Sequence, residues 1–283
     1  MRSPLIWFGG KGMMVPKLVK LLPPHQYYVE VFGGGASLLF AKEPAPAEVY
    51  NDVDESLYNF FSVLKDKKSF ENFYKLATLT PYSRLEFNYA KLQYEREEDP
   101  VKRAYYFFVT VRQSFGGTLS SFGFEVLASA GKNYKRVNSW LSLLELLPEM
   151  HARLMRVQVE GRDWRYILGE YNTPDYFAYL DPPYVMSTRR SRRYKHELTD
   201  ADHKEMVEIM LEYPGMIMLS GYDSELYAPL REAGWDKQRY ETVCHITGKT
   251  RGNIKSREER KREECVWRNP RCMEAIRSVK GEV

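Results

Sequence analysis

A short strand that runs directly into three glycines constrains the fold of this chain most. Tyr27-Tyr-Val-Glu-Val31 is aromatic and β-branched, a composition that favours strands. It continues into Phe32-Gly-Gly-Gly-Ala-Ser37, and an apolar helix start follows at residues 38–40. A strand, a glycine turn and a helix start form the nucleotide-binding βα unit, in which backbone N–H groups face the ligand. The sequence therefore predicts an α/β sheet with a ligand site at this turn.

A second strand is predicted at residues 47–51, and it ends at Asp52. Asp52 lies 19 residues after Gly33, the spacing at which a carboxylate accepts the hydroxyls of a ribose. The same acid is also a plausible cap for the helix that follows, and both roles stay open. The glycines fit G-x-G-x-x-G poorly because Leu38 takes the third position. This pattern favours an adenosine-containing cofactor other than a dinucleotide.

The second landmark is Asp181-Pro-Pro-Tyr184, which follows the apolar run Tyr176–Leu180. The run reads as a buried strand, and the prolines end it abruptly. We expect Asp181 at the carboxyl end of that strand, the edge at which open α/β sheets bind ligands. The Asp181 carboxylate and the Pro182 carbonyl can accept the two N–H hydrogens of an amino group on a flat base, and Tyr184 offers a stacking face. An ordinary turn is the alternative, since Asp and Pro both favour turns.

The remaining patterns predict a mainly parallel sheet that closes with a reversed pair of strands. Further strands are expected at residues 155–159 and 215–219, and a hairpin is expected at 237–246 and 264–268 with a charged loop between. Helical patterns fill residues 13–22, 201–212 and 224–233. Residues 53–150 are mostly helical in pattern, with amphipathic stretches at 55–65 and 100–113 and a leucine-rich helix at 140–147.

Several polar, basic and aromatic loops are candidates for nucleic-acid contact. They are Arg112-Gln-Ser-Phe-Gly-Gly117, residues 120–124 and 132–136, the run Arg189-Arg-Ser-Arg-Arg193, and the basic stretch from Lys249 to Arg257. Side chains of these types contact phosphates and base edges. Basic runs are more often solvated faces, and residues 258–264 read as a solvated helix or loop.

Composition narrows the class of protein. Lys plus Arg number 42 against 38 acidic residues, so a nucleic-acid surface has to come from local clustering of charge. The three cysteines form no Cys-x-x-Cys pair and histidine is scarce, which argues against a metal site and a disulfide framework. No secretory pattern or membrane-spanning run is seen. We therefore expect a cytoplasmic protein without a membrane or metal partner.

Four motifs, taken in order, resemble the Dam-like, D12 class of DNA adenine-N6 methyltransferases. They are Trp7-x-Gly-Gly-Lys11, Glu30-x-Phe-Gly-Gly-Gly35, Asp52 and Asp181-Pro-Pro-Tyr184. The similarity covers nearly the whole chain. The 145 residues between Gly35 and Asp181 leave room for a helical insertion, as in this class. The middle segment resembles better-known Dam enzymes only loosely, so no recognised sequence can be carried over.

The resemblance implies a Rossmann-like S-adenosylmethionine-dependent methyltransferase fold with seven strands in a mixed sheet. It places the catalytic domain at residues 1–56 and 151–283 and a mostly helical target-recognition domain at 57–150. It implies site-specific methylation of N6 of a flipped-out adenine in double-stranded DNA, with S-adenosyl-L-methionine as cofactor. A cognate restriction enzyme is a candidate partner.

The resemblance also implies roles for particular residues. Those expected to bind the cofactor are Trp7, Lys11, Glu30, Phe32, Gly33, Gly35, Asp52, Asp163 and Asp181. The catalytic set is Asp181, Pro182 and Tyr184. The residues expected to contact DNA are Arg112, Ser114, Arg189, Arg190, Arg193 and Lys249.

Three other functions stay open at this point. A methyltransferase acting on RNA or on a protein glutamine can share the Pro-Pro-Tyr loop, although the long insertion and the basic loops favour duplex DNA. A nicotinamide-dependent oxidoreductase has a similar sheet, but the glycine pattern and the absence of an obvious catalytic histidine count against it. A DNA-binding module without activity is the third, and it is disfavoured by the intact Lys11, Asp181 and Tyr184.

Overall fold

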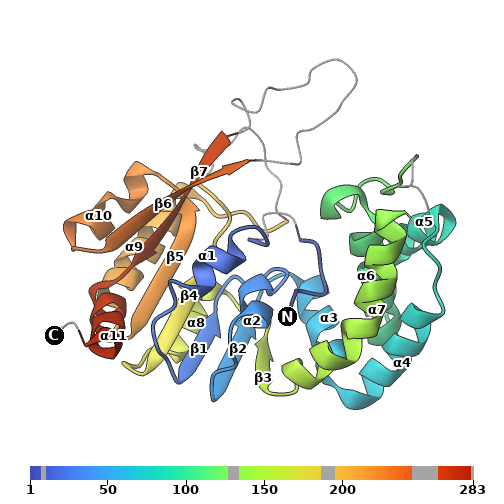
Figure 1. Cartoon of the computed structure of the whole chain (residues 1–283), viewed down its shortest axis with the longest axis horizontal. Coiled ribbons are helices and arrows are strands. Elements are labelled where there is room, and N and C mark those ends of the chain that lie inside the picture. Colours follow the sequence, from blue (N-terminus) through green and yellow to red (C-terminus); the bar gives the residue numbers. More distant parts are fainter. Residues whose placement is uncertain (8–10, 127–133, 186–194, 244–260, 282–283) are drawn as a thin grey trace. The chain divides into compact units, whose positions relative to one another are not determined.

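The structure is a computed structural model, which describes residues 1–7, 11–126, 134–185, 195–243 and 261–281 (Figure 1). The chain divides into two compact units, and each unit draws on two stretches of sequence. Unit 1 comprises Met1–Leu21 and Gly33–Arg162, and unit 2 comprises Leu22–Phe32 and Asp163–Val283. These units are geometrical groupings, and the predicted catalytic and recognition domains stay a prediction.

Unit 1 holds two strands and most of the helices. Its strands are β2 (Ala47–Asn51) and β3 (Val157–Glu160). Its helices are α1 (Val15–Val19), α2 (Ser37–Ala41), α3 (Glu55–Lys65), α4 (Lys67–Thr78), α5 (Arg84–Gln93), α6 (Pro100–Gln113) and α7 (Lys135–Leu154), with the 3-10 turn η1 (Phe115–Gly117).

Unit 2 holds the other five strands. They are β1 (Tyr27–Glu30), β4 (Tyr176–Leu180), β5 (Met216–Tyr222), β6 (Asp236–Val243) and β7 (Lys261–Arg268). Its helices are α8 (Trp164–Glu170), α9 (Asp200–Glu212), α10 (Ala228–Glu232) and α11 (Pro270–Lys280), with the 3-10 turn η3 (Glu225–Tyr227).

The seven strands form one sheet in the order β3-β2-β1-β4-β5-β7-β6. The pairings β2–β3, β1–β4 and β4–β5 are parallel, whereas β7 runs antiparallel to both β5 and β6. The predicted α/β fold with a seven-stranded mixed sheet is therefore confirmed. Within each unit, parallel pairing brings the carboxyl ends of neighbouring strands to the same edge, which is the edge that carries ligand sites in such sheets.

Two features of the last part of the chain differ from the sequence prediction. The second hairpin strand begins at Lys261, inside the stretch predicted as a solvated helix or loop. The charges misled the prediction: β7 pairs with β6 along Glu263 and Glu264, and of these two residues Glu263 is exposed whereas Glu264 is buried and accepts a hydrogen bond from Tyr184. Helix α11 was not predicted, although Asn269 caps it by accepting the N–H of Cys272 and Pro270 opens it.

The helices of unit 1 pack around a cluster of phenylalanines. Phe60 lies at its centre, with the rings of Phe61, Phe73, Phe107 and Phe108 between 5.2 and 6.0 Å away. Aromatic pairs at such distances add about 0.5–1.5 kcal/mol each beyond their buried area. The amphipathic patterns at 55–65 and 100–113 thus mark the apolar faces of α3 and α6, as predicted.

A buried group of charges fixes α2, which follows the glycine loop, to strand β2. Glu48 in β2 pairs with Lys42 at 2.6 Å and with Arg153 of α7. Arg153 also donates to the carbonyl of Leu39 in α2 at 3.1 Å. Burial alone raises the pKa of the Glu48 carboxyl, but the hydrogen bonds from Arg153 and Lys42 outweigh it and hold that pKa below its usual value. The carboxylate therefore stays ionised and keeps the two elements together.

Candidate functional site

The glycine loop follows β1, and its shape requires glycine at two positions. A Cβ on Gly33 would overlap the ring of Tyr50, whose hydroxyl donates to the carbonyl of Gly34 at 2.8 Å. Gly34 has φ of +49°, a left-handed conformation that L side chains rarely adopt. The backbone N–H of Gly33 donates to Asn51 at the end of β2 at 2.7 Å. The loop therefore packs directly on β2.

The amino-terminal segment Ser3–Trp7 covers the other side of this loop within unit 1. Ser3 donates from its hydroxyl to the carbonyl of Gly35, and Trp7 Cδ1 lies 2.9 Å from where a Cβ of Gly34 would stand. The carbonyl of Ile6 occupies the place that a side chain of Gly117 would need. One short segment thus contacts both the glycine loop and the loop after α6. The structure places the predicted Trp7 beside the glycines.

Asp52 follows β2 and is fixed by two backbone donors. Its carboxylate accepts the N–H of Gly34 at 2.8 Å and the N–H of Asp54 at 2.9 Å. Burial raises the pKa of Asp52 to about 6, although both hydrogen bonds act in the opposite direction. No cation of the described residues pairs with it. The helix cap that the sequence left open for Asp52 is provided by Asp54, which accepts the N–H groups of Ser56 and Leu57.

Lys11 lies just before α1, and its side chain is buried. The carbonyl of Lys11 accepts the N–H groups of Met14 and Val15, which sets the first turn of α1. Residues 8–10 of the same motif lie outside the described part of the chain. The structure therefore shows the predicted lysine as an internal residue of unit 1.

Asp181 lies at the carboxyl end of β4, as predicted, next to the end of β1 in unit 2. Glu30 of β1 pairs with Tyr179 of β4, and the N–H of Val31 donates to the carbonyl of Tyr179 at 3.0 Å. Phe32 and Asp181 therefore follow neighbouring parallel strands at the same edge of the sheet. Because Gly33 follows Phe32 directly, the strand that leads into the glycine loop runs beside the strand that leads into Asp181.

A chain of buried hydroxyls positions the Asp181 carboxylate. Ser220 of β5 donates from Oγ to Oδ1 of Asp181 at 3.0 Å, and the Tyr179 hydroxyl lies 2.8 Å from the same Oγ. Tyr179 and Ser220 are almost completely buried. Sequence reasoning missed Ser220, although a serine at the end of the apolar run 216–219 was a usable signal.

Tyr184 is held by two residues of unit 2. Its hydroxyl donates to Glu264 of β7 at 2.7 Å, and its ring lies 4.1 Å from the ring of Tyr222 with an interplanar angle of 31°. Neither Glu264 nor Tyr222 was singled out from the sequence, because β7 and β5 come together with this loop only in the folded sheet. Pro182 is buried, which fixes the backbone between Asp181 and Tyr184.

The other predicted cofactor residues of unit 2 occupy different surroundings. Glu30 is buried and accepts the Tyr28 hydroxyl at 2.8 Å. Phe32 is half-buried, with its ring 6.5 Å from that of Trp164. Asp163 caps α8 by accepting the N–H of Arg165 at 2.9 Å.

The predicted DNA-binding residues are only partly within the described chain. Arg112 lies in the last turn of α6 and donates to Ser139 at 3.2 Å. Ser114 is buried, and its hydroxyl donates to Val111 and accepts the N–H of Leu119, so it closes the loop after α6. The remaining four, Arg189, Arg190, Arg193 and Lys249, lie outside the described residues.

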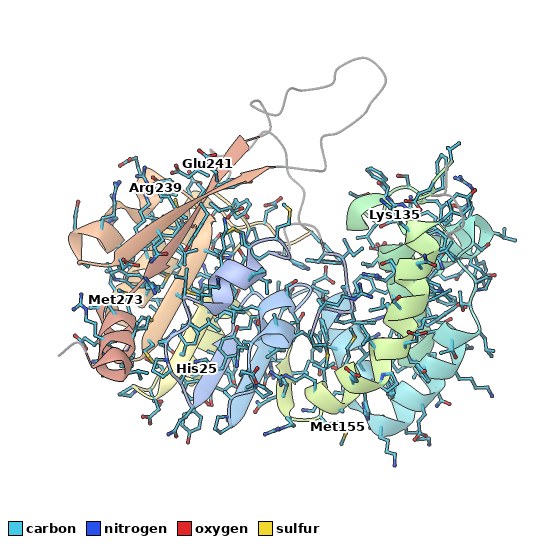
Figure 2. The ribbon with its side chains drawn as sticks, in the orientation of Figure 1. His25, Lys135, Met155, Arg239, Glu241 and Met273 are labelled. Carbon is cyan, nitrogen blue, oxygen red and sulfur yellow. The ribbon has the colours of Figure 1, made fainter. Side chains whose placement is uncertain are left out.

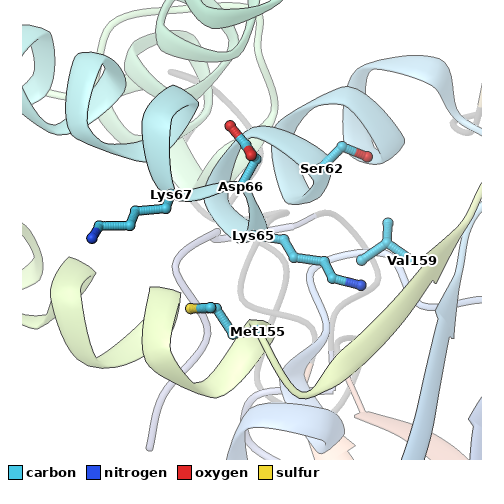
Figure 3. Close-up of a pocket in the computed structure, with 6 residues that line it drawn as sticks. All are labelled: Ser62, Lys65, Asp66, Lys67, Met155 and Val159. Carbon is cyan, nitrogen blue, oxygen red and sulfur yellow. The ribbon is translucent and has the colours of Figure 1, made fainter.

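A pocket of about 420 Å³ lies elsewhere in unit 1 (Figure 3). Its lining comes from α3, the start of α4, the end of α7 and strand β3, through Ser62, Lys65, Asp66, Lys67, Met155 and Val159. None of the predicted site residues lines it, so it is separate from the candidate site.

No helix in the described part of the chain combines the length and the apolar character that a membrane span needs.

No curated protein matches the sequence. The family model described as D12 class N6 adenine-specific DNA methyltransferase matches residues 7–234, a span that includes Trp7, the glycine loop, Asp52 and Asp181. The chain therefore belongs to the D12 class of N6 adenine-specific DNA methyltransferases, enzymes that methylate N6 of adenine in DNA.

Proposed function

We propose that this methyltransferase uses S-adenosyl-L-methionine as its donor and acts on a flipped-out adenine in double-stranded DNA. The observation that carries the proposal is Asp181, which Ser220 positions at the carboxyl end of β4, beside the strand that enters the glycine loop. The carboxylate lies at the sheet edge where such folds bind ligands. Asp181, Pro182 and Tyr184 form the proposed catalytic set.

The proposed role of Asp181 and Pro182 is to hold the N6 amine and make it more nucleophilic. The lone pair of this amine is delocalised into the adenine ring, so the free base is a poor nucleophile. When the carboxylate and the Pro182 carbonyl accept its two N–H hydrogens, electron density returns to nitrogen and the positive charge that develops there is stabilised. The bound donor supplies a methyl group on a sulfonium, which is already activated. The protein therefore mainly has to align the N6 nitrogen with the methyl group and the sulfur of the donor.

Tyr184 is proposed to stack on the adenine. An adenine inside a duplex cannot reach a carboxylate at a sheet edge, so the base has to leave the helix. Tyr222 packs on the Tyr184 ring and Glu264 accepts its hydroxyl, which keeps the ring in one orientation. A fixed aromatic face lowers the entropy lost when the base docks.

The residues around the glycine loop fit an adenosine cofactor. Asp52 is a carboxylate without a cation partner among the described residues, and each of its oxygens keeps a lone pair after accepting one backbone N–H. Ribose hydroxyls are donors of the kind such a carboxylate accepts. The full proposed cofactor set is Trp7, Lys11, Glu30, Phe32, Gly33, Gly35, Asp52, Asp163 and Asp181.

Recognition of DNA is proposed for residues 57–150, with Arg112 and Ser114 in that segment. Arg189, Arg190, Arg193 and Lys249 are proposed to add phosphate contacts, because basic side chains dominate binding to the backbone of DNA. A cognate restriction enzyme is the proposed partner of the enzyme in the cell.

The substrate and donor can be tested together. We expect the purified protein to transfer the tritiated methyl group of S-adenosylmethionine to duplex DNA and to yield N6-methyladenine on digestion. RNA and glutamine-containing peptides serve as competitors and should neither accept label nor slow the reaction. Label in RNA or peptide with none in duplex DNA would contradict the proposal. Mapping the methylated adenines then identifies the target sequence.

The pKa of Asp52 predicts a pH dependence of cofactor binding. Because burial raises this pKa from 3.8 to about 6, the carboxylate is ionised at pH 7.5 and largely protonated at pH 5. Protonation removes acceptor capacity, so we expect the dissociation constant of S-adenosylmethionine to rise about tenfold over this range. Isothermal titration calorimetry measures it. The Asp52→Asn variant should bind S-adenosylmethionine more weakly at pH 7.5, and its dissociation constant should not change with pH. If the dissociation constants of the variant and the wild type change equally with pH, Asp52 is not the origin of the pH dependence.

A further inference from the structure

Helix α5 of unit 1 carries apolar side chains on two opposite faces. Phe87 and Ala90 are buried against the rest of the unit. Leu85, Tyr89 and Leu92 lie on the other face, where their side chains are 75%, 52% and 59% exposed. A helix that packs on a core with one face usually has polar and charged side chains on the opposite face. The outer face of α5 departs from this pattern, so it is a surface that a partner can cover.

The three exposed residues form one stripe along α5. They occupy positions i, i+4 and i+7, the spacing that aligns side chains along one face of an α-helix. Tyr89 is held in place by Tyr106 of α6, since their rings meet edge-on with centroids 5.7 Å apart. The exposed Met155, by contrast, lies well away from α5, at the other end of unit 1 (Figure 2). A single exposed apolar residue is common on protein surfaces, whereas a line of three is typical of a helix that binds a partner.

Two opposite charges flank the stripe, one at each end. Arg84 is the first residue of α5, and Glu95 lies in the turn that follows the helix. This turn continues the helical path, because the N–H of Glu97 still donates to the carbonyl of Gln93 at 2.9 Å. Arg84 and Glu95 are 11 residues apart, which is about three helical turns. The two charges therefore lie on the same side of the stripe.

Both charged groups can still bind a partner. The Arg84 guanidinium lies 4.9 Å from the ring centroids of Phe122 and Phe124, and a guanidinium stacked on a ring keeps the N–H donors at its edge available. Glu95 accepts the Tyr94 hydroxyl at 3.1 Å through one oxygen, which leaves further acceptor sites on the carboxylate. Within the described residues, neither group forms an ion pair.

The apolar stripe and the two charges have nearly the same centre. The midpoint of Leu85 and Leu92 and the midpoint of Arg84 and Glu95 both lie within about 1 Å of Tyr89 along the helix axis. A twofold axis that crosses α5 at this point generates a second α5 antiparallel to the first. In such a pair each flank of the helix meets the same flank of the other copy. Leu85 of each copy then contacts Leu92 of the other, and Arg84 of each copy faces Glu95 of the other.

We propose that the outer face of α5 is a self-association surface, on which a second copy of this chain docks its own α5 in antiparallel orientation. A twofold interface has to be complementary to itself, and the stripe with its two end charges meets that requirement. Burial of the exposed leucines removes apolar surface from water, which favours association. The two ion pairs specify the antiparallel orientation, because a parallel pair would bring like charges together.

The first test measures self-association of the full chain by sedimentation velocity over a series of protein concentrations. We expect wild-type protein to approach twice the mass of one chain as its concentration rises. Leu85→Glu/Leu92→Glu should raise the dissociation constant of the dimer by more than about 100-fold, since four leucines per dimer lose their buried contacts. Met155→Glu is the matched control. It introduces the same charge at an apolar side chain that is 57% exposed, and it should keep the wild-type constant.

A charge exchange tests the orientation of the two helices. Arg84→Glu places two carboxylates opposite each other at both ends of the pair, and it should raise the dissociation constant by about tenfold. Glu95→Arg places two guanidinium groups there and should have a similar effect. The exchange Arg84→Glu/Glu95→Arg restores opposite charges and should restore the wild-type constant. Non-specific association through exposed leucines would not respond in this way.

Thermal unfolding of each variant shows whether its fold is intact, and the charge exchange provides a second test if the glutamate pair in the stripe does not fold. A wild-type protein that stays monomeric up to about 0.5 mM overturns the proposal. So does an unchanged dissociation constant in folded Leu85→Glu/Leu92→Glu, or an equal rise in Met155→Glu. If the charge exchange weakens association as much as the single variants do, the antiparallel pairing is wrong.

Discussion

Replacing Asp181 with alanine is expected to lower the rate of methyl transfer by about 100- to 1000-fold, the effect of removing one preorganised hydrogen-bonding group from an active site. The carboxylate acts mainly on the charge that develops on nitrogen, so its loss affects the transition state more than the ground state. Binding of S-adenosylmethionine should persist, because the proposed contacts to the ribose come from Asp52. A tritium-transfer assay measures the rate of methyl transfer, and isothermal titration calorimetry measures the binding of S-adenosylmethionine.

Two further variants make this test specific. Asp175 is an exposed carboxylate just before β4, so Asp175→Ala removes the same charge at the opposite end of the strand and should leave turnover unchanged. Ser220→Ala removes the hydrogen bond to Asp181, and we expect a loss of about 1 kcal/mol, or roughly fivefold in rate. Unimpaired turnover in Asp181→Ala would refute the catalytic role of the carboxylate.

The second large effect is expected on stability, from Gly117→Ala. Gly117 has φ of +70°, and a Cβ there would overlap the backbone carbonyl of Ile6. The left-handed conformation costs alanine about 1 kcal/mol, and overpacking against a backbone adds about 1–3 kcal/mol. A backbone carbonyl cannot rotate away as the end of a flexible side chain can.

Gly116 offers a closely matched control for this prediction. Its φ of +64° is almost the same, but a Cβ there would meet nothing within 4 Å. Gly116→Ala should therefore cost only the conformational part, about 1 kcal/mol. Melting followed by circular dichroism should show a drop in Tm for Gly117→Ala at least twice that for Gly116→Ala. Equal drops would mean that the Ile6 segment moves aside without cost.

The sequence was most informative where local pattern decides structure. The apolar run 176–180 and the prolines after it determined both β4 and the place of Asp181, because burial and proline geometry act within a few residues. The glycine loop could be predicted for the same reason. The strand order was not predicted, since pairing between distant strands leaves no mark on any single segment.

Contacts between distant residues could not be predicted in this way. Ser220 contacts Asp181 because of the β4–β5 register, and Glu264 contacts Tyr184 because β7 lies antiparallel to β5. The hydrogen bond from Arg112 to Ser139 depends on how α7 packs on α6, which periodicity alone does not specify. In each case the residue type was visible in the sequence, but its partner was determined by tertiary packing.

The segment Ser3–Trp7 has a consequence for engineering new specificities. Ile6 packs on Gly117 while Ser3 and Trp7 pack on Gly35 and Gly34, so these few amino acids link two loops that are far apart in sequence. Grafting the 57–150 segment of another family member onto this scaffold would leave a foreign loop facing a native Ile6. A chimera is therefore better built as a two-piece transplant, in which the donor's own first seven residues accompany its insertion.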